Sequence, residues 1–313
     1  MKTTSGLRTA MRFVTPHQYS QSSKAHFTIN TNAVNQMVKF FPPLSAKDKV
    51  LDFGCGTGET TVALAAGELG NLGKPGQVLG VDISQEMIDH CKLLHTTPNL
   101  KFQQLDVETR VCQAFAAEQE GQFDLVTSFS CLHWVPNQPA AVSFFNKVLK
   151  KGGLFNFVIA STHNPRDNIQ RSVYDSMKLN GKWAKLLKNT SWPHFKTTHI
   201  NNSWMSTVDK QGSGPIIEKD FVKLMESNGF KVQESRSLPL GYVLHKDFIK
   251  NYFRSTILTA FPEIQGEERK LFFTDYIRKM KELDMLNTQG SPDYYRSYID
   301  GFQLFGTKVS DAQ

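Results

Sequence analysis

The segment KVLDFGCGTGET, residues 49–60, decides the fold. Its first half is mostly apolar, as in a buried strand, and Gly54, Gly56 and Gly58 then form a glycine-rich turn. Glycine lets the backbone turn sharply and approach a ligand closely. The sequence ETTVALAAGEL follows and predicts a helix. We therefore expect a strand–turn–helix unit whose turn is a candidate ligand site.

The same pattern repeats along the chain to residue 160. Ser84 is a candidate N-cap of a helix with Met87, Ile88, Cys91 and Leu94 on one face. The further expected strands are QVLGVDIS, LKFQQLDV, FDLVTSFSCLHW and GGLFNFVIA. The helices expected between them are the one after Ser84, an Ala- and Glu-rich helix, and AAVSFFNKVLK. Such alternation predicts an α/β fold, a doubly wound Rossmann-like parallel sheet with helices on both faces. Ligands of such sheets bind beyond the carboxyl ends of the strands.

The flanking segments predict additions to this core. A helix is expected over 29–41, residues 161–216 are polar and irregular in pattern, and KDFVKLMESNGF predicts a helix. Two amphipathic helices over 245–284 then precede a last strand, YIDGFQLFGTKV. We expect three regions: a basic tail with cofactor-closing helices (1–44), a ligand-binding core (45–160), and the rest of the sheet with an added helical lid (161–313, the lid at about 161–216 and 245–284).

Three acids follow three successive predicted strands near the glycine-rich turn. Glu59 stands where the dinucleotide fingerprint has its third glycine, and no Gly-Lys-Ser/Thr of a phosphate-binding loop is present. Asp52 and Glu59 would repel phosphate, whereas Asp82 is placed to accept ribose hydroxyls and Asp106 an adenine amino group. Any one of these acids could instead be a helix N-cap. Together they indicate a cationic nucleoside without phosphate, which describes S-adenosylmethionine.

The motif series VLDFGCGTGET, VLGVDIS, FQQLDV and FDLVTSFSCLHWV resembles that of class I S-adenosylmethionine-dependent methyltransferases over residues 45–160. The sequence CLHWV and the downstream helices resemble juvenile hormone acid O-methyltransferases and, more distantly, trans-aconitate methyltransferases. The resemblance implies a seven-stranded sheet and an N-terminal helix whose Tyr19 closes over the cofactor. Where that family has a glutamine for the substrate acid, this chain has His26 or, with a shift, Gln21. The predicted cofactor site comprises Tyr19, Asp52, Gly54, Cys55, Gly56, Asp82, Ile83, Met87, Asp106, Val107, Ser128 and Phe129.

The expected reaction is methylation of the carboxylate of a small, largely apolar acid resembling farnesoic or juvenile hormone acid. A carboxylate is ionised at pH 7 and needs no base, only donors that orient it. Trp134 is such a donor, and His133 and His26 are further catalytic candidates. His133 would act as a base if the acceptor were a phenol or amine, and His133→Ala would then cost much more activity. His133 and Trp134 could also merely pack the end of a strand.

An apolar slot for the substrate is expected at the lid. Its candidate residues are Trp204 and Tyr242, and Gln21 in the N-terminal segment is a further candidate for binding the substrate acid. No metal site is predicted, and the oligomeric state stays open between monomer and homodimer.

The distribution of charge excludes a basic nucleic-acid-binding body. The chain of 313 residues has 36 Lys and Arg against 29 Asp and Glu, a net charge of +7. Six of these cations and no acid lie in residues 1–47, which leaves 30 basic against 29 acidic residues afterwards. A methyltransferase that acts on RNA or protein needs a basic surface to bind it, and the nearly neutral body does not predict one. We therefore expect a small-molecule partner. The basic segment is either an uninvolved tail or an attractor for an anionic substrate.

The cysteines and the lengths of the apolar segments indicate the cellular compartment of the protein. The four cysteines form no C-x-x-C pair, which favours free thiols in a reducing compartment. No stretch has the roughly 18 apolar residues that span a bilayer. The N-terminus weakly resembles an organelle transit segment, but a basic tail and a cytoplasmic location are preferred. A non-catalytic binding protein is disfavoured by the intact set of Gly54, Gly56, Asp82 and Asp106.

Overall fold

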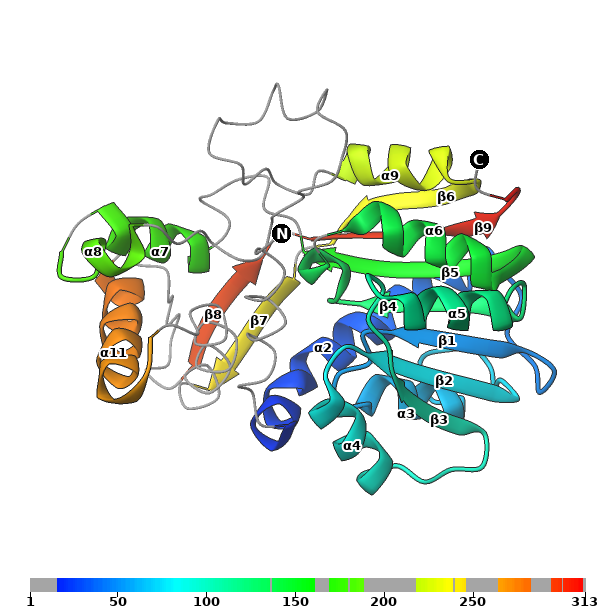
Figure 1. Ribbon diagram of the computed structural model, residues 1–313, viewed down its shortest axis with the longest axis horizontal. Coiled ribbons are helices and arrows are strands. Elements are labelled where there is room, and N and C mark those ends of the chain that lie inside the picture. Colours follow the sequence, from blue (N-terminus) through cyan, green and yellow to red (C-terminus); the bar gives the residue numbers. More distant parts are fainter. Residues whose placement is uncertain are drawn as a thin grey trace.

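A seven-stranded sheet with helices on both faces forms the centre of the computed structural model (Figure 1). The structure describes residues 16–135, 137–160, 169–179, 181–188, 218–238, 240–245, 264–282, 294–299 and 301–311. In spatial order the strands are β3 (Leu100–Gln104), β2 (Gln77–Asp82), β1 (Lys49–Phe53), β4 (Phe123–Phe129), β5 (Leu149–Ala160), β9 (Gly301–Lys308) and β6 (Phe230–Ser237). Strands β1 to β5 pair in parallel, and β9 is antiparallel to both neighbours. The predicted α/β fold and seven-stranded sheet are confirmed.

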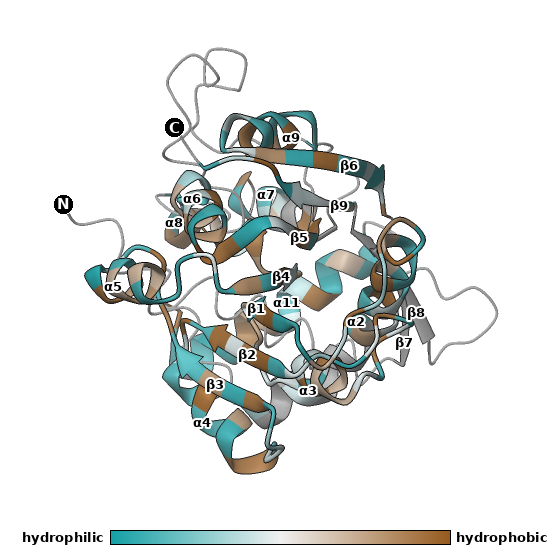
Figure 2. Cartoon of the chain, turned by 90° about the vertical axis from the view of Figure 1, so that its right-hand side faces the viewer, coloured by the Kyte–Doolittle hydropathy of each residue, from teal (hydrophilic) through white to brown (hydrophobic). Residues whose placement is uncertain are grey.

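Two apolar layers hold the helices on the sheet. The helices are α2 (Pro16–Met37), α3 (Glu59–Ala66), α4 (Gln85–Leu94), α5 (Arg110–Glu118), α6 (Gln138–Val148), α7 (Ile169–Leu179), α8 (Ala184–Leu187), α9 (Glu218–Ser227) and α11 (Gly266–Glu282), with a 3₁₀ turn, η2 (Leu132–Trp134). One core layer joins α2, α3 and α4 to the sheet, and the other joins α5, α6, α9 and the added helices. Figure 2 shows apolar residues along the central strands and hydrophilic ones on the outward side of α9.

Local caps explain where several helices begin. The Ser84 hydroxyl accepts a hydrogen bond from the Met87 N–H, as predicted, and Thr109 and Asn137 cap α5 and α6 in the same way. Gly67, in the left-handed region, ends α3 earlier than the apolar pattern suggests. On α4 the predicted apolar face is correct except for Leu94, which is 57% exposed because it lies in the last turn, beyond the sheet.

Several predicted elements were wrong in extent. Helix α2 begins at Pro16 and ends at Met37, rather than spanning 29–41, because its first half is polar and shows no apolar period. The expected last strand divides into β8 (Tyr294–Ile299) and β9. Strand β8 pairs with β7 (Leu240–His245) in a second, two-stranded sheet. The segment 161–216, irregular by pattern, contains α7 and α8, and the helix expected over 247–261 lies outside the described residues.

The added elements gather beyond the carboxyl ends of the parallel strands (Figure 1). Helices α7 and α11 pack together, and Trp183 donates a hydrogen bond to Asp275 and stacks edge-on against Phe272. Helix α2 runs from this end of the sheet back along one face (Figure 1). Among the described residues, no helix is long and apolar enough to cross a membrane. The edge expected to bind a ligand is thus bounded by α2 and the added helices.

Candidate active site

The glycine-rich turn between β1 and α3 folds tightly against the end of β2. Gly54, Gly56 and Gly58 all have positive φ, of 77°, 54° and 88°. The N–H groups of Gly54 and Cys55 both donate to the Val81 carbonyl. A Cβ at position 54 would lie 2.1 Å from the Cys131 Sγ. The turn therefore forms a cradle that only glycine fits, as the sequence predicted.

Asp52 lies buried beneath this turn. Its two carboxylate oxygens accept hydrogen bonds from the Thr61 and Thr127 hydroxyls, at 2.6 and 2.8 Å. Burial raises the pKa of Asp52 to about 6, although the two hydroxyls act in the opposite direction. No lysine or arginine is among the described residues that line the adjoining cavity. The carboxylate is thus held in place without a countercharge from these residues.

Asp82 shapes the turn as well as facing the ligand edge. Its oxygens accept from the Gly56 and Ser84 N–H groups, both at 2.9 Å. Burial raises the pKa of Asp82, and these backbone donors oppose that shift. Each carboxylate oxygen has two lone pairs, so Asp82 retains acceptor capacity for a ribose hydroxyl.

Asp106 lies two residues beyond the end of β3 rather than at the strand end. Its carboxylate accepts from the Glu108 N–H, and its carbonyl accepts from the Thr109 hydroxyl. Next to it, Val107 packs against the core. Ile83 is 37% exposed directly after Asp82, an apolar surface beside the ligand edge. These positions agree with a site for a flat base, although none of them lines the cavity described next.

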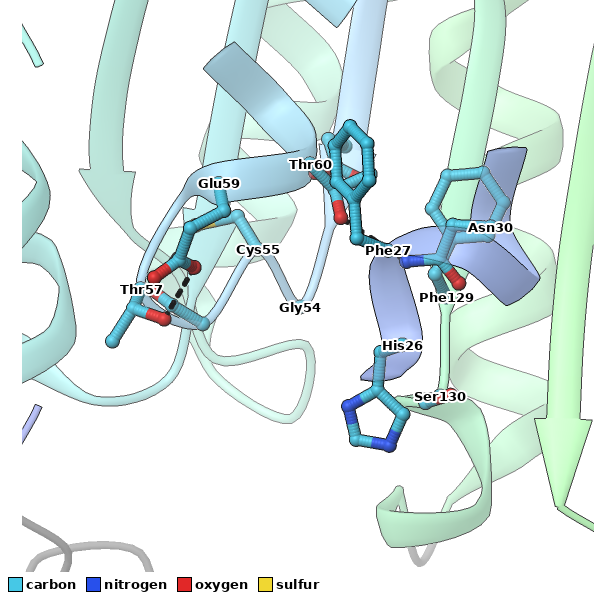
Figure 3. Close-up of a pocket in the computed structure, with 12 residues that line it drawn as sticks. His26, Phe27, Asn30, Gly54, Cys55, Thr57, Glu59, Thr60, Phe129 and Ser130 are labelled. Atoms are coloured by element: carbon cyan, nitrogen blue, oxygen red, sulfur yellow. Dashed lines mark hydrogen bonds between the residues drawn. The ribbon is translucent and has the colours of Figure 1, made fainter. Parts of the chain in front are cut away.

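A cavity of about 300 Å³ opens beside the turn, between β1, α3, α2 and the segment after β4 (Figure 3). Its lining residues are His26, Phe27, Asn30, Asp52, Gly54, Cys55, Gly56, Thr57, Glu59, Thr60, Phe129 and Ser130. Six predicted site residues are thereby brought together: His26, Asp52, Gly54, Cys55, Gly56 and Phe129. Glu59 accepts hydrogen bonds from the Ser20 and Thr57 hydroxyls, which ties α2 to the turn.

Two predicted cofactor residues lie inside the core instead. The Ser128 hydroxyl donates to the Phe53 carbonyl at 2.9 Å, and Met87 is buried on α4. The structure thus places both behind the ligand edge.

The predicted cofactor residue Tyr19 and the three predicted substrate residues are less completely described. Tyr19 and Gln21 lie on α2 and Tyr242 on β7, where the structure describes the backbone only, and Trp204 lies outside the described residues.

His133 lies in η2, directly after β4, and its ring orientation is fixed by the backbone. The Ala160 N–H donates to His133 Nδ1 at 3.2 Å. A neutral imidazole that accepts at Nδ1 carries its proton at Nε2. Burial lowers the pKa of His133 to about 3, with a contribution from His26, and burial lowers the pKa of His26 to about 4. Both rings are therefore neutral at physiological pH, and His133 offers an N–H donor.

Trp134 follows His133 in the same turn. The two rings lie 5.6 Å apart, centre to centre, tilted by 36°. Its indole nitrogen can only donate. The turn η2 thus carries two neighbouring hydrogen-bond donors.

Six lining residues were not among the predicted site residues: Phe27, Asn30, Thr57, Glu59, Thr60 and Ser130. Of these, only Glu59 was noted in the sequence, as an acid that suits a cationic ligand. Asn30 follows His26 by four residues, so helical spacing alone would place both on one face. Ser130 has φ of +54°, a property that the sequence does not reveal. Among the described residues, no group of three or more His, Cys, Asp or Glu side chains could hold a metal ion.

Known proteins resemble this chain in sequence and fold. A family model described as a methyltransferase domain matches residues 28–235, more than half of the chain. Juvenile hormone acid O-methyltransferase of Bombyx mori is 27% identical over 248 residues, which are 77% of each chain. Trans-aconitate 2-methyltransferase of Deinococcus radiodurans is 30% identical over 149 residues, 48% of this chain and 50% of that protein. A solved protein from Bacillus halodurans superposes with a TM-score of 0.54 at 15% identity, covering 90% of this chain and all of that one, which supports the fold alone.

The chain therefore belongs to the class I S-adenosylmethionine-dependent methyltransferases, as the motif series implied. Its cofactor is S-adenosylmethionine, which supplies a methyl group activated by a positively charged sulfur. The site fits that molecule: the cradle admits no side chain at Gly54, and Asp52 and Glu59 suit a cationic ligand without phosphate. Asp82 adds acceptor capacity for a ribose.

Proposed function

We propose that this enzyme transfers a methyl group to the carboxylate of a small, largely apolar acid and so forms its methyl ester. One observation carries the proposal: His133 accepts the Ala160 N–H at Nδ1 and is therefore a donor at Nε2. A donor is suited to orient an acceptor that is already anionic. A phenol or amine would instead require the ring to take up a proton.

The other residues at the edge are consistent with a carboxylate acceptor. Trp134 adds an indole N–H beside His133, and neutral His26 lines the cavity from α2. Methyl transfer is an in-line displacement, so these donors serve to hold one carboxylate oxygen in line with the methyl group and to exclude water. Phe27 and Phe129 give the cavity an apolar side, which suits an acid with a hydrocarbon body.

Two observations support a terpenoid acid as the substrate class: the name of a relative, and the hydrogen-bond donors and apolar side chains at the site. The Bombyx mori relative is named for juvenile hormone acid. We infer a farnesoic or juvenile-hormone-acid-like substrate, with Gln21, Trp204 and Tyr242 as candidates for contacts with it. A cytoplasmic location and a partner set limited to small molecules belong to the same proposal.

A methyl-donor assay against fatty, terpenoid and dicarboxylic acids, with product mass as the readout, tests the function. We expect addition of 14 mass units (the net gain of one CH₂) to terpenoid or fatty acids, with a product that alkaline hydrolysis returns to the acid. Methylation of amines or phenols but of no acid would contradict the proposal. The Gly54→Ala variant, which should not bind cofactor, controls for background methylation.

The pH profile separates a donor role of His133 from a base role. Because the pKa of His133 is lowered to about 3 and that of His26 to about 4, both stay neutral above pH 5. We expect kcat with the acid substrate to be flat between pH 6.5 and 8.5. His133→Ala should lower kcat about 10- to 100-fold, the range for a hydrogen bond to a charged group, equally at every pH. His133→Gln, which retains a donor, should recover part of the loss; a loss in His133→Ala that changes with pH would favour the base role.

A further inference from the structure

A second cavity, of about 520 Å³, lies at the edge of the sheet opposite to the active site. Its lining includes Lys49 and Gln77, which are the first residues of β1 and β2, so the cavity opens at the amino ends of the strands. Leu79 on β2 and Phe115 on α5 give it an apolar side, and Lys101 on β3 adds a second cation. A volume of this size with an apolar side and a few polar groups is typical of small-molecule sites.

The strand register places these side chains on one face of the sheet. Strand β1 pairs with β2 from Lys49 onward, and Leu79 of β2 pairs with Lys101 of β3. Paired residues of parallel strands point to the same face. Helix α5 lies on this face but packs against α6, with the Phe115 and Phe144 rings 6.2 Å apart. The face of the edge strand β3 therefore stays open beside α5, and Lys101 is exposed there.

The two ammonium groups of this cavity have no carboxylate partner among the described residues. Neither Lys49 nor Lys101 forms an ion pair with a described acid. Asp124 accepts the backbone N–H of Lys49, but its other oxygen is bound by Lys150 Nζ at 2.6 Å. Burial lowers the pKa of Lys49, and the charges of Lys101 and Lys150 lower it further. A bound anion would relieve this repulsion.

Structural roles for the two lysines account for only part of their charge. Lys49 Nζ donates to Gln119 Oε1 at 2.7 Å, at the carboxyl end of α5, where the helix dipole amounts to about half a negative charge. Lys101 on an edge strand also discourages pairing with other chains, a reason that does not apply to Lys49 on the central strand β1. More than one positive charge therefore remains for a ligand.

Three glutamines add neutral donors around these cations. Gln77, Gln103 and Gln119 line the cavity, and none of their amide nitrogens donates to another described residue. A phosphate monoester carries close to two negative charges and three acceptor oxygens, whereas a carboxylate has one charge and two oxygens. Two ammonium groups with several amide donors match the phosphate better.

We propose that this cavity binds a phosphate monoester with an apolar body, the phosphate held between Lys49 and Lys101 and the body packed on Leu79 and Phe115. The inference concerns the amino ends of the strands and not the methyl acceptor, so it is independent of the carboxylate proposal.

Ligand-observed NMR titration of the protein saturated with S-adenosylhomocysteine tests this site. The probes are phenyl phosphate, inorganic phosphate, which lacks the apolar body, and phenylacetate, which lacks the second charge. We expect phenyl phosphate to bind at least about threefold more tightly than either of the others. Lys101→Gln should weaken its binding about two- to fivefold, the range for an exposed charge pair, and Lys49→Gln combined with Lys101→Gln at least about tenfold.

A matched variant separates the site from general attraction of anions to the protein. Lys92 is an exposed lysine on α4, which covers the other face of the sheet, so Lys92→Gln should bind all three probes as the parent does. Lys101 is exposed, and Lys101→Gln therefore carries the test even if the double variant does not fold. The proposal would be overturned by unchanged affinity for phenyl phosphate in Lys101→Gln, by equal affinity of the parent for the three probes, or by no binding at millimolar phenyl phosphate.

Discussion

At the scale of single residues, Gly54 shows how closely the turn fits its surroundings. Its φ of 77° disfavours any side chain, and a Cβ would be 2.1 Å from Cys131 Sγ. Gly152 has a similar φ of 79° but nothing within 4 Å of its Cβ position. The two glycines therefore share the conformational demand and differ in the space around them.

This difference gives a paired prediction. Gly152→Ala should lower the free energy of unfolding by about 1–2 kcal/mol, the cost of a left-handed alanine. Gly54→Ala should lower it by more, because the clash with Cys131 adds to that cost. Gly54→Ala should in addition abolish binding of S-adenosylhomocysteine, because the turn must shift to relieve the clash. Urea denaturation and calorimetry measure the two effects. Undiminished cofactor affinity in Gly54→Ala would show that the turn is not the cradle.

Asp52 makes cofactor affinity depend on pH. Burial raises its pKa to about 6, so the carboxylate is ionised at pH 7.5 and mostly protonated at pH 5. A cationic ligand favours the ionised form, and affinity for S-adenosylmethionine should therefore fall by up to about tenfold for each pH unit below 6. Titrations between pH 5 and 8 measure this slope. Asp52→Asn should bind weakly with no slope over the same range, and a flat profile in the parent would contradict the prediction.

Chain position alone predicts which residues gather at the carboxyl ends of the strands. The glycines, Asp52 and Asp82 stand directly at strand ends, where topology alone brings them together. Ser130 could not be found in this way, because its role depends on a backbone angle imposed by the pairing of β4 with β5. For Ser128, the pattern could not tell that its hydroxyl bonds the Phe53 carbonyl inside the sheet.

At the scale of elements, α2 connects the cavity to the far side of the sheet. Gln303 on β9 donates to the Ala33 carbonyl of α2 at 2.6 Å and to Asn156 Oδ1 at 2.9 Å, and it accepts from Arg236 Nε. The bond to Ala33 holds the helix that carries Asn30. A buried polar network of this kind fixes one arrangement of the helix on the sheet.

We expect Gln303→Ala to lower the free energy of unfolding by about 1–3 kcal/mol, because Arg236 and Asn156 lose a partner. Gln303→Ala should also lower the affinity for the cofactor, because α2 is no longer held in register with the glycine-rich turn. Gln233 lies on the neighbouring strand β6 and is exposed, so Gln233→Ala is the matched control. Thermal unfolding and cofactor titration provide the measurements. Normal affinity in a destabilised Gln303→Ala protein would confine its role to stability.

Among the elements, those with a strong apolar period were predicted correctly and those defined by long-range packing were not. The strands and helices of 49–160 carry their burial in their own sequence. One of them was predicted too long: the strand expected to continue to Trp134 ends at Phe129, and Leu132–Trp134 forms the turn η2. The first half of α2 has no apolar stripe, and it contacts the start of α3 through a polar bond, from the Ser20 hydroxyl to Glu59. Strands β8 and β9 run almost continuously in sequence, and only their pairing with different partners separates them.

At the scale of the whole molecule, charge at the cavity predicts an order of binding. Asp52 and Glu59 are present there without a described cation, so the positive charge comes with the cofactor. An acid substrate, as proposed, should bind more tightly when that charge is in place. We expect at least tenfold tighter binding of the acid in the presence of sinefungin, which carries an amine near the sulfur position, than in the presence of S-adenosylhomocysteine.

The uncharged methyl ester of the same acid is the control for this prediction. It should bind equally with either cofactor analogue, because it has no charge to be attracted. If the acid bound equally tightly with sinefungin and with S-adenosylhomocysteine, the acceptor would not be a carboxylate, or another cation would neutralise it at the site. Isothermal titration with each preformed binary complex decides between these outcomes.

Strand β9 lies between β5 and β6, although it follows both in the chain. During synthesis on the ribosome, β5 and β6 therefore emerge with a vacant place between them, and residues 301–308 must leave the exit tunnel before the sheet can close. Until then the edges of β5 and β6 are open to pairing with other chains, a hazard for unprotected strands. The bond from Gln303 to the Ala33 carbonyl of α2 needs the same strand, so this hold on α2 is gained only after translation has passed residue 308.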